Sequence, residues 1–148
     1  MGLNISYRAF DAPYSVFMRF RVELAKRMGI PLRLMEGFYS DSPDYMDNPF
    51  AMLERKYPKG NETEMWKIRE IKEVLPLKWE TLKPNPIHEL LYHSDCDGYI
   101  NFSSVRKMVP ELEKLVNKEE QSEFQERLET FISGCKVAIK ERSRLDFG

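Results

Sequence analysis

Cysteine is scarce in this sequence, because the 148 residues contain only Cys96 and Cys135. Two cysteines cannot build the disulfide framework of a small secreted domain, so we expect a reducing, cytoplasmic location. No apolar run reaches the roughly 20 residues that cross a bilayer, and the N-terminus lacks a secretory pattern. We therefore expect no membrane association. Gly2 and Ser6 match the loose N-myristoylation pattern, but a pattern this short often occurs by chance.

The sequence also lacks an excess of charge of one sign. Its 23 Lys and Arg residues balance 24 Asp and Glu residues, for a net charge of −1. This balance leaves no electrostatic footprint for nucleic acid, so we expect none to bind. Internal repeats and low-complexity tracts are missing as well, and 42% of the residues are hydrophobic. This content suffices for a core, and we predict a single domain over residues 1–148.

In the N-terminal half, two periodicities predict a strand and then a helix. Apolar and polar residues alternate over 3–10, which predicts a strand whose one side carries the following residues: Leu3, Ile5, Tyr7 and Ala9. Helical spacing follows, with Asp11 as the expected cap and Gly29 as the stop. The expected core positions of this helix are Phe17, Phe20, Leu24 and Met28. The arginines between them are expected on the remaining faces.

The middle of the chain combines a turn-rich loop over 38–50 with a second helical pattern. The loop contains Asp41, Asp44 and Asp47, which we interpret as solvated turn carboxylates rather than metal ligands. Asn61 and Glu64 resemble a capping box, and apolar spacing continues to Leu75.

The C-terminal half predicts further helices and one short strand. Asn85 is expected to cap a short helix before residue 93, and a helix after 104 should kink or restart at Pro110. A long final helix should begin near Asn117, with Glu120 as its capping-box partner. Residues 144–147 are expected to form a short strand that pairs with the first strand. The predicted fold is therefore mainly α with a minor β component.

Residues 93–104 carry most of the twelve-place EF-hand calcium pattern. Asp95 and Asp97 stand at places 3 and 5, Gly98 at place 6, and Ile at place 8. Tyr99 would offer its backbone carbonyl and Asn101 a side-chain oxygen. Alternate side chains of a tightly curved loop converge, and Ca²⁺ requires six to eight oxygen ligands. The candidate metal ligands are thus Asp95, Asp97, Tyr99 and Asn101.

Both end positions of this loop are defective. His93 offers nitrogen where the pattern has Asp, and Ser104 offers a neutral oxygen where the pattern has a bidentate Glu. Only two charged ligands remain and no second EF-hand loop is found, so any calcium affinity should be on the order of millimolar or weaker. The favoured interpretation is a metal-free turn in which Asp95 and Asp97 bind backbone amides and a serine caps the next helix.

Two other chemistries stay open at this loop. His88, His93 and Cys96 could supply zinc ligands, but their spacing is poor and no fourth ligand is obvious. Cys96 beside His93 could also act as a nucleophile, although no third group that would orient the base can be read. An enzyme with this region or the loop over 41–47 in a cleft is the least favoured hypothesis.

The central segment also resembles a family. Residues 90–98, LLYHSDCDG, resemble the core motif of a group of small bacterial and phage proteins that have no assigned activity. Residues 14–21 and 145–147 are similar to that group as well. The resemblance implies a bacterial or prophage origin, which argues against myristoylation. It also implies that relatives have an acid near the position of Ser104, so the serine of this chain departs from the group and argues further against a bound metal ion. We therefore expect a small cytoplasmic accessory protein, not an enzyme, that binds a protein partner. The alternative is a weak calcium-binding module that uses loop 93–104.

Overall fold

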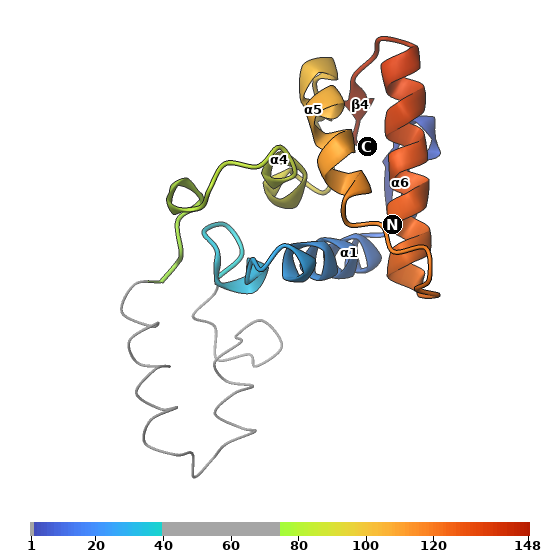
Figure 1. The fold of residues 1–148 in the computed structure, drawn as a ribbon. Coiled ribbons are helices and arrows are strands. Elements are labelled where there is room, and N and C mark those ends of the chain that lie inside the picture. Colours follow the sequence, from blue (N-terminus) through green and yellow to red (C-terminus); the bar gives the residue numbers. More distant parts are fainter. Residues whose placement is uncertain (1, 40–74) are drawn as a thin grey trace. The chain divides into compact units, whose positions relative to one another are not determined.

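The computed structural model describes residues 2–39 and 75–148 (Figure 1). Its strands are β1 (Gly2–Ile5), β2 (Phe10–Pro13), β3 (Tyr99–Ile100) and β4 (Leu145–Asp146). Its α-helices are α1 (Tyr14–Arg27), α4 (His88–Tyr92), α5 (Phe102–Glu113) and α6 (Glu123–Lys140). Short 3-10 helices are η1 (Ser6–Arg8), η2 (Leu32–Leu34) and η3 (Trp79–Thr81). The predicted mainly α fold with a minor β component is confirmed, since β1–β2 and β3–β4 form the two small sheets of the described residues.

The chain divides into two compact units. The main unit comprises Met1–Gly29 with Pro84–Gly148, and the insert unit comprises Ile30–Lys83. In the described part of the insert unit, Met35 and Leu77 form a parallel bridge, and the Trp79 indole donates to the Glu36 carbonyl at 3.1 Å. Most of the loop over 38–50 and the capping box at 61–64 lie outside the described residues. The single domain over residues 1–148 stays a prediction.

The N-terminal strand is shorter than predicted. β1 ends at Ile5, and Tyr7 and Arg8 adopt left-handed φ values of 59° and 56°. This turn reverses the chain, so β2 pairs antiparallel with β1, with Ile5 opposite Phe10. The prediction of one strand over 3–10 is wrong because the turn residues include no Gly, Pro, Asn or Asp that would have marked it.

Helix α1 begins directly after this hairpin. Pro13 is its N-cap, and the predicted cap Asp11 lies within β2 instead. The predicted stop at Gly29 is confirmed, because its φ of 75° is one that glycine adopts without steric cost. Phe17 of α1 packs edge-on against Phe10 with 5.0 Å between the ring centroids. The hairpin and α1 therefore share one aromatic core.

Helices α5 and α6 complete the main unit. α5 runs through Pro110 without restarting, because the proline lies on the exposed face, where the carbonyl that loses its helical partner can meet water. α6 begins at Glu123, later than predicted, because the Ser122 hydroxyl rather than Asn117 caps it by accepting from the Gln125 amide at 3.1 Å. Glu120, the predicted box partner, instead binds Arg27 at 2.7 Å.

The predicted C-terminal strand is confirmed as β4, with a different main partner. β4 pairs with β3, whereas the residues just after it contact β1: Phe147 bridges to Ile5, and the Gly148 amide donates to the Asn4 carbonyl. Among the described helices, none is long and apolar enough to cross a membrane.

Candidate functional site

The region with the EF-hand pattern forms a helix–loop–helix. α4 is followed by residues 93–98, then by the short strand β3, and then by α5. The Asn85 side chain accepts from the Ile87 amide at 2.9 Å and so orders the turn before α4, close to its predicted capping role. Gly98 has a φ of 88°, which permits the sharp turn at place 6. The predicted loop shape is therefore present.

The imidazole of His93 lies inside this loop. Its Nε2 is 3.0 Å from the Tyr99 carbonyl oxygen, and its Nδ1 is 2.8 Å from the Ser94 carbonyl oxygen. A Cβ atom on Gly98 would lie 3.3 Å from the ring, so glycine also makes room for the imidazole. The other side of the ring stacks on Phe147 with 4.0 Å between centroids. His93 thus engages the carbonyl that the calcium pattern assigns to the ion.

The other candidate ligands also have protein partners. Asp97 accepts from the Ser94 hydroxyl at 2.8 Å. The Asn101 side chain caps α5, because its Oδ1 accepts from the Ser104 amide and the Ser103 hydroxyl, both at 2.9 Å. Ser104 therefore contributes its backbone to the helix cap. The predicted serine hydroxyl cap is wrong here, because the longer amide side chain of Asn101 reaches the amide three residues on.

Arg21 is a buried cation beside the loop, although its place between the apolar positions of α1 predicted an exposed face. Arg21 of α1 is only 4% exposed, and its Nη1 donates to the carbonyls of His93 at 2.6 Å and Leu91 at 3.2 Å. Burial lowers the pKa of Arg21, and the negative charge of Asp95 partly offsets this shift. The signal was its spacing, since Arg21 follows Phe17 by four residues and therefore shares the core face of the helix.

The strand of the loop pairs with the C-terminal segment. Tyr99 lies opposite Asp146 and Ile100 opposite Leu145, and the Phe147 amide donates to the Gly98 carbonyl at 2.9 Å. Ile100 is fully buried, as predicted for the residue that anchors the loop to the core. β4 therefore occupies the edge of the loop strand that a second EF-hand loop usually covers.

The residues of the zinc and thiol hypotheses, His93 and Cys96, have different hydrogen-bond partners. Both ring nitrogens of His93 contact carbonyl oxygens, whereas Cys96 Sγ lies 3.5 Å from the Ser94 hydroxyl and is exposed. Burial lowers the pKa of His88. Within residues 2–39 and 75–148, no three His, Cys, Asp or Glu side chains gather as a metal site.

Comparison of the chain with protein-family models, with curated proteins and with solved structures gives no significant match. The resemblance of residues 90–98 to bacterial and phage proteins stays a prediction.

Proposed function

We propose that this protein is a non-enzymatic interaction module whose EF-hand-like loop is closed by protein groups instead of a metal ion. The observation that carries the proposal is the contact of His93 Nε2 with the Tyr99 carbonyl at 3.0 Å. An N–H donated at the centre of the loop satisfies an oxygen that would otherwise bind a cation. In this proposal the protein acts in the cytoplasm of a bacterium, or of a host carrying a prophage, as the accessory partner of another protein.

The energetic cost of loading an ion supports the same proposal. An ion that used the ligands of the pattern would compete with the hydrogen bonds to Tyr99, Asp97 and Asn101. Each such bond contributes about 1 kcal/mol of net stability, and loss of the helix cap costs about the same. Only two carboxylates would attract the ion and offset this lost stability, because His93 and Ser104 bring no negative charge.

Calcium titration tests the proposal against weak calcium binding by the same loop. A site with a Kd of about 1 mM would stabilise the fold by about 1.4 kcal/mol at about 10 mM calcium, or roughly 3–6 °C in Tm. We expect no binding heat by calorimetry, and a Tm that is the same in calcium and in chelator. A calcium-dependent rise in Tm that Asp97→Ala abolishes would support the alternative and contradict the proposal.

A gain-of-function variant provides the positive control. His93→Asp with Ser104→Glu restores both defective positions of the pattern, and Glu suits the first turn of α5. We expect this double variant to bind calcium, while the same variant with Asp97→Asn binds less tightly. If the double variant folds and still binds no calcium, the loop geometry itself excludes the ion, and the argument from His93 is wrong.

A further inference from the structure

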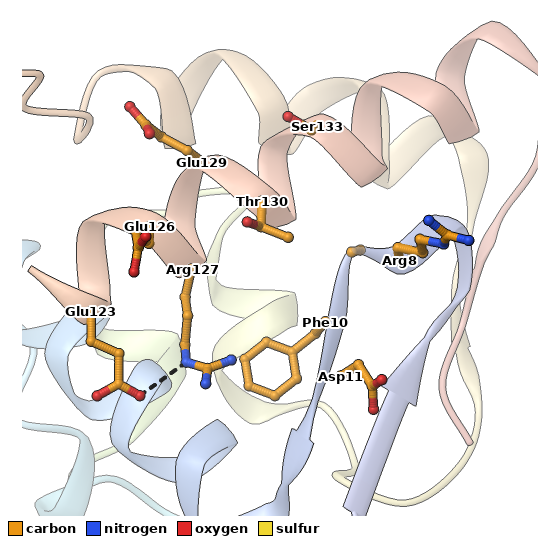
Figure 2. Close-up of a pocket in the computed structure, with 10 residues that line it drawn as sticks. Arg8, Phe10, Asp11, Glu123, Glu126, Arg127, Glu129, Thr130 and Ser133 are labelled. Carbon is orange, nitrogen blue, oxygen red and sulfur yellow. Dashed lines mark hydrogen bonds and ion pairs between the residues drawn. The ribbon is translucent and has the colours of Figure 1, made fainter.

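We propose that the groove between β2 and α6 binds an extended peptide segment that carries basic side chains and lies alongside β2. This inference specifies the kind of partner and rests on the interaction role proposed above. The groove is a hollow of about 600 Å³ in the main unit, formed by η1, β2 and the first turns of α6. Figure 2 shows Phe10 pointing from β2 toward Arg127 of α6, with Glu123 and Glu126 along the helix.

The groove has a closed end and an open end. At the closed end, Gly134 of α6 approaches Ala9 so closely that an added Cβ would lie 2.5 Å from the Ala9 Cα. Toward the N-terminus of α6, Glu126 and Thr130 are exposed along the hollow. α6 therefore packs tightly on the hairpin at Ala9, and nearer its N-terminus it forms one wall of a groove whose other wall is residues 8–11.

β2 presents a free edge to an incoming chain. Among the described residues, β1 is its one strand neighbour, whereas the opposite side of β1 is contacted by the C-terminal segment through Gly148 and Phe147. The wall of the groove comes from residues 8–11, with no residue of β1. Alternate residues of an antiparallel strand direct their N–H and C=O groups away from the paired neighbour. A peptide that adds a strand can bind those groups, except that Pro13 offers a carbonyl and no N–H, and about 13 Å of extended chain would span the four residues of β2.

The charge of the groove selects the occupant. Its lining contains four carboxylates, from Asp11 and three glutamates of α6, against two guanidiniums. Arg127 is already engaged, because it binds Glu123 at 3.1 Å and lies over the Phe10 ring at 5.3 Å. In the described part of the chain, no salt bridge or side-chain hydrogen bond involves Asp11 or Glu126. These two carboxylates, one on β2 and one on α6, belong to the lining of the groove and give it a negative charge that complements lysine or arginine.

The test uses a fluorescein-labelled peptide that alternates arginine and valine, titrated with the full chain in fluorescence anisotropy. We expect saturable binding, with Asp11→Asn and Glu126→Gln each weakening it roughly two- to fivefold and the double variant more. Glu119→Gln, which removes an exposed carboxylate outside the groove, should leave the affinity unchanged. The same peptide with glutamate for arginine should not bind. Loss of affinity when alternate peptide amides are N-methylated would show that backbone pairing contributes.

Amide chemical shifts locate the site. Binding should perturb residues 10–12 and 123–130, with little change over 93–104. No binding of the basic peptide, binding of the acidic peptide as tight as that of the basic one, or wild-type affinity in both the Asp11→Asn and Glu126→Gln variants would overturn this proposal. Since the calcium titration measures the loop and not the groove, failure here is distinguishable from failure of the metal-free proposal.

Discussion

Replacing His93 with alanine should destabilise the protein by about 2–3 kcal/mol. The imidazole lies within hydrogen-bond distance of two carbonyl oxygens, at 3.0 and 2.8 Å, and a neutral ring donates to one of them for about 1 kcal/mol. Its stacking on Phe147, at 4.0 Å between centroids, adds about 0.5–1.5 kcal/mol. The alanine variant also leaves a cavity beside Gly98, which adds to the loss of stability. The loop cannot collapse into this cavity because β4 holds its backbone.

Urea denaturation followed by circular dichroism measures this loss, with a fall in Tm of roughly 4–12 °C as the thermal counterpart. His93→Phe separates the contributions, because it keeps a ring over Phe147 and removes the hydrogen bond that the imidazole donates. We expect His93→Phe to lie between wild type and His93→Ala. A double-mutant cycle with Phe147→Leu should give a coupling of about 0.5–1.5 kcal/mol. If His93→Ala changes stability by less than about 0.5 kcal/mol, as a surface substitution does, the imidazole does not close the loop.

Two further predictions concern α6. Gly134→Ala should destabilise by about 1–3 kcal/mol in urea denaturation, because its Cβ would lie 2.5 Å from Ala9, whereas Ser133→Ala on the exposed face should change little. Burial raises the pKa of Cys135 to about 12, so a thiol reagent at pH 8 should modify exposed Cys96 in the native protein and Cys135 only after unfolding. The raised pKa stabilises the native state fully below the unfolded thiol pKa of about 9, and this contribution is lost as the pH rises toward 12. Cys135→Ala should remove that part of the alkaline loss of stability, and rapid native modification of Cys135 would contradict its burial.

The spacing of apolar residues predicted which face of an element is buried, where burial depends on those residues alone. Phe17, Phe20 and Leu24 gave α1 its core face, and Ile100 gave the loop its anchor. Prediction failed where a single polar contact decided the boundary. α6 begins at Glu123 with Ser122 as its cap, and not near Asn117, because both residues are good caps and the contacts of Gln125 select between them.

The contents of the candidate site were less predictable than its shape. Local spacing identified Gly98, because the positive φ of this residue is set by the turn within the loop. His93 contacts Phe147, and the charge of Asp95 acts on the pKa of Arg21, and both Phe147 and Arg21 are remote from the loop in the sequence. No local pattern shows that a ring from place 1 stacks on the C-terminal segment. The histidine was therefore interpreted as a defective ligand, although its contacts give it a role in the closed loop.

These remote contacts tie the loop to its surroundings in a way that limits its response to an ion. Arg21 holds the carbonyls of Leu91 and His93 where α4 ends, so the entering helix is fixed to α1. β4 holds the strand of the loop, and Phe147 holds the imidazole. An opening of the loop would have to break contacts to α1 and to the C-terminal segment together. Because a ligand shifts a conformational equilibrium only by its differential affinity, a site with two carboxylates has too little binding energy to drive that change. The shape of the loop, and any surface that depends on it, should therefore be the same at every calcium concentration.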